Sequence, residues 1–157
     1  MLNFLDNSGL PPPPPARLEL LQDSFEQRFP SAYLQFLQAN NGKKLKDGRI
    51  TIGDVDVVID KFLPVVANIK TDTQAWADVA VVTSQLDSRL ATNIEMTCQN
   101  LIPFAATPSG DFFVFDYSSN RQQPAIALWD HELSDDFAPM TRFIAKDFEA
   151  FLELIGK

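Results

Sequence analysis

The stretch LIPFAATPSGDFFVFDY, residues 101–117, decides the fold of this chain. It begins with an apolar run, passes through the turn signal Pro108-Ser109-Gly110, and ends in the Phe-rich run from Asp111 to Tyr117. Two apolar runs separated by a Pro-Gly turn are typical of neighbouring antiparallel strands. A further apolar run, residues 125–130, follows a short polar stretch. It predicts a third strand, paired with the second as a hairpin.

Helical patterns flank this centre on both sides. Apolar residues recur every three or four positions over 16–29, and a second helix begins at Pro30 and ends at the Asn-Asn-Gly signal of residues 40–42. Residues 72–91 return to helical spacing. The last helix covers residues 147–155, with Asp147 as its N-cap.

Together these elements predict an α+β fold. Residues 50–52 and 55–59 predict two more strands around a Gly-Asp turn. We expect a central antiparallel sheet of about four to six strands, with helices at both chain ends. We expect one domain over residues 16–157. The proline-rich segment 1–15, which ends in Pro11–Pro15, is interpreted as a stiff spacer, with a docking peptide as the alternative.

Charge and composition exclude several classes of function. The net charge of −8 argues against binding to nucleic acid or to an anionic membrane, because both need clustered cations. Lys43, Lys44, Lys46 and Arg49 form a basic cluster, either a second contact surface or a solvated loop. The single cysteine, Cys98, is interpreted as a buried apolar residue. The first residues lack the pattern of a secretory signal, so we expect a cytoplasmic protein.

The sequence offers few candidates for catalytic residues. His131 is the only histidine, no nucleophile motif accompanies it, and no Cys-x-x-Cys pair or glycine-rich phosphate loop is present. We therefore expect no enzyme activity, no small-molecule substrate, no metal and no other cofactor. A small hydrolase around His131 and a pair of glycosidase carboxylates stay open as alternatives.

Acidic residues are concentrated toward the C-terminal end. Residues 111–157 hold nine acidic and four basic groups, a net charge of −5. This excess indicates either a solvated face or a docking surface for a basic protein. Trp76 and Trp129 fit core positions better than interface positions, but Trp129 is kept as a possible anchor. The contact candidates are Asp111, Asp116, Trp129, Asp130, Glu132, Asp135 and Asp136.

Several segments, taken in order, resemble the SUKH superfamily, which includes fungal cell-wall-assembly regulators and bacterial immunity proteins. The resemblance covers about residues 15–156. It rests on the two N-terminal helices with their Asn-Gly stop, on Ile102-Pro103-Phe104-Ala105 with the Gly110-Asp111 turn, on Leu128 to Glu132, and on a closing helix over 144–152. The long proline run and residues 76–100 depart from the family's pattern.

This resemblance implies a binding module without catalysis. Bacterial members of the superfamily neutralise polymorphic toxins, often nucleases, so it implies a basic toxin domain as partner and a monomer or weak dimer as the free state. An acidic protein is suited to this role, because a nuclease presents cations to phosphate. A regulatory adaptor that recruits a cellular protein is the alternative.

Overall fold

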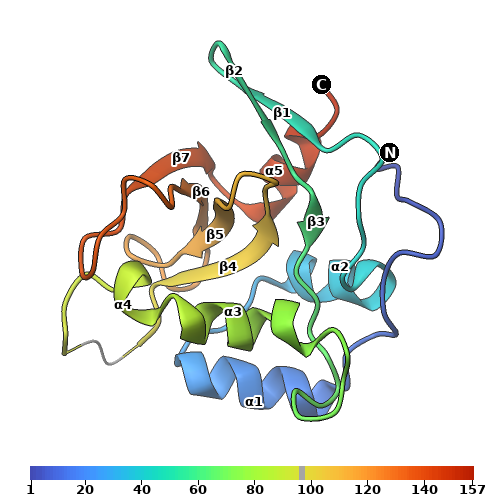
Figure 1. Cartoon of the computed structure of the whole chain (residues 1–157), viewed down its shortest axis with the longest axis horizontal. Coiled ribbons are helices and arrows are strands. Elements are labelled where there is room, and N and C mark those ends of the chain that lie inside the picture. Colours follow the sequence, from blue (N-terminus) through green and yellow to red (C-terminus); the bar gives the residue numbers. More distant parts are fainter. Residues whose placement is uncertain (96–97) are drawn as a thin grey trace.

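A computed structural model describes residues 1–95 and 98–157, and it shows a single α+β domain (Figure 1). Its centre is a five-stranded antiparallel sheet of order β3-β4-β5-β6-β7. These strands are β3 (Lys61–Phe62), β4 (Leu101–Ala106), β5 (Phe112–Asp116), β6 (Ala125–Trp129) and β7 (Thr141–Ala145). The hairpin of β1 (Arg49–Ile52) and β2 (Val55–Val58) forms a separate sheet that projects from the domain.

The helices lie at both chain ends and between β3 and β4. They are α1 (Pro15–Phe25), α2 (Ser31–Asn40), the 3-10 turn η1 (Ala75–Ala77), α3 (Val79–Gln85), α4 (Asp87–Leu90) and α5 (Phe148–Leu154). The sequence therefore predicted the fold class, the two N-terminal helices and the last helix correctly. Asp147 caps α5 as predicted, since its carboxylate accepts a hydrogen bond from Ala150 N at 2.8 Å.

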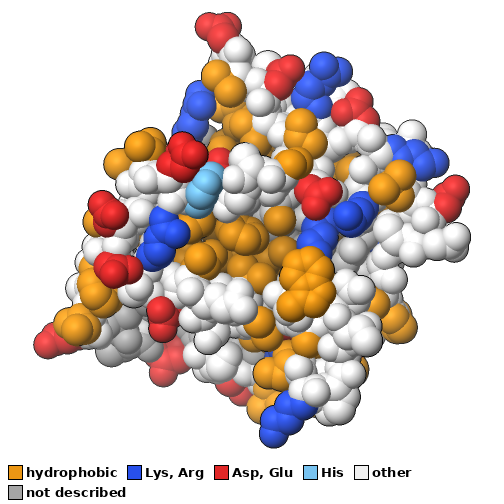
Figure 2. Space-filling view, in the orientation of Figure 1, with side chains coloured by type: hydrophobic (Ala, Val, Ile, Leu, Met, Phe, Trp, Pro, Cys, Tyr) orange, Lys and Arg blue, Asp and Glu red, His pale blue; other side chains and the backbone are white. Residues whose placement is uncertain are grey.

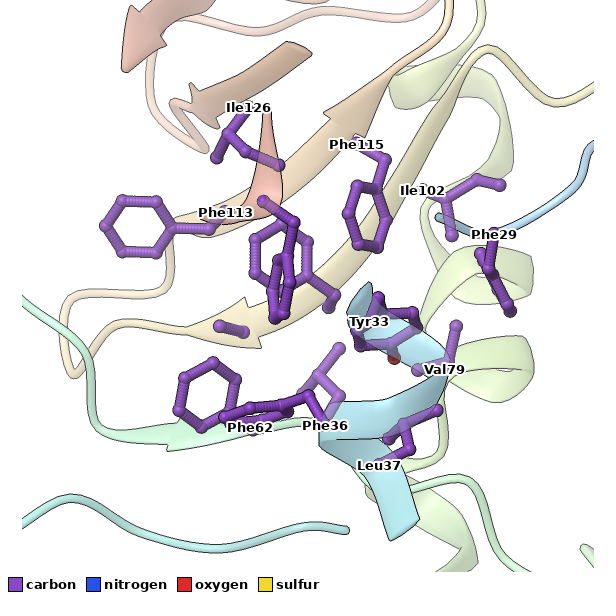
Figure 3. Close-up of a cluster of buried hydrophobic side chains, with 14 of the residues drawn as sticks. Phe29, Tyr33, Phe36, Leu37, Phe62, Val79, Ile102, Phe113, Phe115 and Ile126 are labelled. Atoms are coloured by element: carbon purple, nitrogen blue, oxygen red, sulfur yellow. The ribbon is translucent and has the colours of Figure 1, made fainter. Parts of the chain in front are cut away.

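The main core is formed by one face of the sheet together with buried residues of helices α1, α2, α3 and α5 (Figure 3). Alternation along β5 turns Phe113 and Phe115 toward this core. The ring of Phe115 stacks on Phe104 at 4.4 Å and meets Tyr33 edge-on at 4.9 Å. Aromatic residues thus supply much of the packed volume, as the 13 Phe of the composition suggest.

A smaller core occupies part of the opposite face of the sheet. Val114, which alternation turns away from Phe113 and Phe115, packs there with Leu90 of α4 and Trp129 of β6. Trp129 is 1% exposed. Both faces of β5 are therefore apolar near its middle, which explains why its sequence is a run of hydrophobic residues rather than a strict alternation.

Two expectations about the elements are wrong. Residues 144 and 145, assigned to the closing helix, form the end of β7, where Ala145 pairs with Ile126; the helix starts only after the Asp147 cap. The continuous helix expected over 72–91 is three short pieces. Asp78 starts a new helix after η1 by capping Ala80 N, and Leu86 separates α3 from α4.

The N-terminal segment packs against the domain. Phe4 contacts the rings of Phe36 and Phe62, and Asn41 Nδ2 donates to Pro11 O at 2.8 Å. The last proline, Pro15, is the first residue of α1, a position that suits proline. Among the described residues, no helix combines the length and apolar character that crossing a membrane requires.

Candidate partner-binding surface

The loop between β6 and β7, residues 130–140, carries most of the predicted contact residues; we call it the acidic loop. Asp130 organises its start. Its Oδ1 accepts hydrogen bonds from Glu132 N at 2.8 Å and Leu133 N at 2.9 Å, and its backbone N–H donates to Met140 O at 3.0 Å. An aspartate that bonds the backbone two or three residues ahead is a common turn former, so Asp130 shapes the loop.

Helix α4 holds the acidic loop in place. Arg89 Nη2 donates to the carbonyl oxygens of His131 and Ser134, the latter at 2.8 Å. Ser88 Oγ donates to Asp136 Oδ1 at 2.7 Å, and Ser88 O accepts from Phe137 N at 2.7 Å. These contacts join the loop to α4 at several points, which limits the conformational entropy that it would lose on binding.

Asp111 ties the turn before β5 to the same loop. Its Oδ1 accepts a hydrogen bond from His131 N at 2.9 Å and lies 2.6 Å from His131 Nδ1. This hydrogen bond is the main reason that the pKa of His131 is raised above its ordinary value, with the charges of Asp111, Glu132 and Asp130 adding to it. His131 therefore reduces the negative charge of the surface when it is protonated.

The surroundings of His131 differ from those of a hydrolase base. In a catalytic triad the second ring nitrogen faces a nucleophilic hydroxyl. Here Nε2 of His131 lies 3.9 Å from the carboxylate oxygen of Glu132. The geometry gives His131 a role in fixing the loop, at the end of a strand as the sequence suggests.

Three potential metal ligands also meet at this place. Ligand atoms of Asp111, Asp130 and His131 all lie within 4.8 Å of one another, although Asp111 is about 20 positions from the other two. Asp111 and Asp130 already use their carboxylates to accept backbone N–H groups of the loop. In the described structure these groups fix the loop's conformation.

The structure thus brings together five of the seven predicted contact residues. Asp111 and Asp130 are partly exposed, and Glu132, Asp135 and Asp136 are exposed. Asp116 lies at the opposite end of β5 from Asp111, about 17 Å away at the usual rise of a strand.

The tryptophans and the cysteine differ from several expectations. Trp129 is buried beneath Arg89 and donates from Nε1 to Arg89 O at 3.1 Å, so it supports the loop from within and offers no surface to a partner. Trp76, favoured as a core residue, is 64% exposed, because it lies on η1 rather than on the inner face of a long helix. Cys98 is partly exposed rather than buried.

Sequence reasoning missed the apolar part of the acidic loop. Leu133, Phe137 and Met140 are 65%, 40% and 51% exposed. Their signal was available in the sequence: large apolar residues in a stretch that follows neither helical nor strand periodicity. Carboxylates beside exposed apolar side chains match the polar rim and apolar centre of a protein interface.

Comparison with known proteins assigns the chain to a family. A search of curated proteins finds no match. The family model described as SMI1-KNR4 cell-wall, SUKH_6, matches residues 16–152, which is most of the chain and includes every element from α2 to β7. The chain therefore belongs to the SMI1-KNR4 family of the SUKH superfamily.

Proposed function

We propose that this chain is an immunity protein that binds and neutralises a cognate polymorphic toxin domain. Membership of the SMI1-KNR4 family supports an immunity or regulatory domain in general. The feature that carries the proposal further is the acidic loop, where exposed carboxylates stand beside exposed apolar side chains on a backbone fixed by Arg89, Ser88 and Asp111.

The proposed partner is a basic domain, such as a nuclease. Its substrate cleft must present cations to phosphate groups, and the carboxylates of Glu132, Asp135 and Asp136 offer those cations an alternative set of anions. The net charge of −8 accelerates the encounter through long-range attraction. Leu133 and Phe137 then supply apolar area that leaves water when the complex forms.

Binding alone accounts for neutralisation in this proposal. A bound protein that covers the cleft blocks the substrate sterically and occupies the cations with its own carboxylates. No bond is made or broken. Because His131 is hydrogen-bonded to Asp111 and faces Glu132, its place in the proposal is to set the charge and shape of the loop.

A comparison of two charge-reversed variants tests this function. Glu132→Lys with Asp135→Lys changes the acidic loop, and Asp54→Lys with Glu153→Lys makes the same change of four charges elsewhere. All four residues are exposed, and their side chains make no hydrogen bond to any residue that the structure describes; Glu132 only lies 3.9 Å from His131 Nε2. The wild type and both variants are used as bait in lysate of the source cells, and retained proteins are identified by mass spectrometry.

The proposal predicts a retained protein with a basic domain that the acidic-loop variant loses and the control variant keeps. Expression of that domain alone should stop growth, and co-expression of the wild-type chain should restore it. Retention of resident proteins only, bound equally by both variants and harmless when expressed, would contradict immunity and favour the regulatory adaptor.

A further inference from the structure

A groove opens on the sheet face opposite the main core, beside the small core under α4. It has a volume of about 560 Å³. Ala106 and Phe112, which are register partners on β4 and β5, belong to its lining, together with Val82 and Leu86 from α3 and its C-terminal end and Trp76 from η1. We call it the Trp76 groove. Figure 2 looks onto this side, where hydrophobic side chains gather at the centre and charged side chains of both signs lie around them.

One end of the Trp76 groove is positively charged. Lys44 and Lys61 both line it, and Asp60 is the carboxylate beside them. Lys61 Nζ lies 4.1 Å from the centre of the Trp76 ring, and Lys44 Nζ lies 3.8 Å from Asp60 Oδ1. Two ammonium groups therefore share one neighbouring carboxylate, which leaves this end able to accept an anion.

The groove continues past the two lysines into a second hollow. This smaller space, about 220 Å³, is lined by residues 7–10 of the N-terminal segment and shares Lys44, Lys61 and Gln74 with the Trp76 groove. The lysines thus lie where the largely apolar groove joins a hollow of mixed polar and apolar lining. An elongated ligand fits this shape better than a compact one, because the two compartments share these residues and continue into each other.

We propose that the Trp76 groove binds an extended segment of a partner protein in which an acidic side chain stands next to a large apolar side chain. The apolar side chain packs between Trp76, Leu86 and Phe112. The carboxylate meets Lys61 and Lys44, and the backbone continues along Gln74 into the second hollow. This proposal is independent of the immunity function, because the acidic loop and the groove have opposite charge and share no lining residue.

The state of Lys61 fits this ligand. Partial burial and the nearby Lys44 both lower the pKa of Lys61. An incoming carboxylate would relieve the repulsion between the two ammonium groups, and it would make a charge-assisted hydrogen bond. Trp76 also fits, since tryptophan is enriched among the residues that anchor protein interfaces and 64% of this side chain is accessible to a partner.

The experiment selects ligands from a phage-displayed library of random peptides on the full-length chain. We expect the selected peptides to carry Asp or Glu within two positions of Leu, Ile, Phe or Trp. One selected peptide is then synthesised and titrated into the wild type, Lys61→Glu, Trp76→Ala and Lys146→Glu. Lys146 is exposed and makes the charge change away from the groove.

We expect Lys61→Glu and Trp76→Ala each to weaken binding of the peptide by about tenfold or more, and Lys146→Glu to leave it nearly unchanged. Replacing the peptide's acidic residue by its amide should weaken binding to the wild type. Amide spectra recorded for each variant verify that it is folded.

Three results would overturn the proposal. The first is a selection that enriches no acidic–apolar pair. The second is a selected peptide that Lys61→Glu and Trp76→Ala bind as tightly as the wild-type protein does. The third is saturation of the groove by octanoate more tightly than by any selected peptide, which would assign the site to small apolar carboxylates instead.

Discussion

His131 is held by Asp111 on one side and lies near Glu132 on the other, so its protonation changes the net charge at the start of the acidic loop. The hydrogen bond to Asp111 raises its pKa in the folded state above the ordinary value near 6.5. Because its pKa is higher in the folded state, protonated His131 stabilises the folded protein. This contribution to the free energy of unfolding is fully present below the unfolded pKa, and it is lost as the pH rises through the folded pKa.

A proton NMR titration measures the pKa of His131 directly. Because the chain has one histidine, its ring signal needs no assignment by mutation. We expect a midpoint above 6.5 in the wild type and a downward shift toward 6.5 in Asp111→Asn. A midpoint that Asp111→Asn leaves unchanged would show that the hydrogen bond does not set the pKa of His131.

Tyr33 is a buried core residue whose hydroxyl finds no hydrogen-bond partner among the described residues. A buried and unsatisfied hydroxyl costs free energy that a ring without it does not. We therefore expect Tyr33→Phe to raise the free energy of unfolding by about 1 kcal/mol, measured by urea denaturation. Tyr117→Phe is the matched control, since the Tyr117 hydroxyl donates to Arg28 O at 2.9 Å and its loss should destabilise the protein.

At the scale of elements, Asp78 joins three parts of the fold. Its carboxylate accepts from Ala80 N at the start of α3 and from Val66 N after β3, and it pairs with Arg17 of α1 at 3.1 Å. The Asp78 side chain is fully buried. This one residue explains both the first break in the helix expected over 72–91, between η1 and α3, and the position of α1 beside α3.

Removing Arg17, the positively charged partner of Asp78, should therefore lower the free energy of unfolding. We expect Arg17→Met to lower the free energy of unfolding by about 3 kcal/mol, because it leaves a buried carboxylate without its counter-charge. Arg28→Met is the control: Arg28 pairs with Asp23 at 2.7 Å, but both side chains are more than half exposed, so the loss should stay below about 1 kcal/mol. Equal losses in the two variants, by thermal or urea unfolding, would contradict this account.

The sequence predicts best the elements whose signals are local. The Asp147 cap, the Gly53-Asp54 turn and the Pro-Ser-Gly turn before β5 each depend on a few neighbouring residues, and each was placed correctly. Strand β7 was missed because its TRFIA sequence is short and largely exposed, and its strand character comes from pairing with β6. The burial of Trp129 and the exposure of Trp76 likewise depend on which neighbours the tertiary fold supplies.

At the scale of the whole molecule, topology assembles the candidate surface. Asp111 lies about 20 positions before His131, and the antiparallel register of β5 and β6 brings the two together. The acidic composition predicted that this region would be charged. The apolar residues of the loop and the Trp76 groove could not be predicted, since exposure depends on elements distant in sequence.

Net charge also sets how the proposed complex should respond to salt. If attraction between the acidic loop and a basic toxin speeds association, the association rate constant should fall as the salt concentration rises. Glu132→Lys with Asp135→Lys should flatten this dependence. Stopped-flow measurements at several salt concentrations check it, and an association rate that salt leaves unchanged would rule out electrostatic steering.

The central claim is that the acidic loop is the surface that binds the toxin. Its most direct test is the dissociation constant of the retained basic domain, measured by calorimetry for the wild type and the two charge-reversed variants. We expect Glu132→Lys with Asp135→Lys to weaken binding by about a hundredfold, and Asp54→Lys with Glu153→Lys by less than about threefold. Equal weakening by both variants would contradict the claim, because only the overall charge, and not the acidic loop, would then matter.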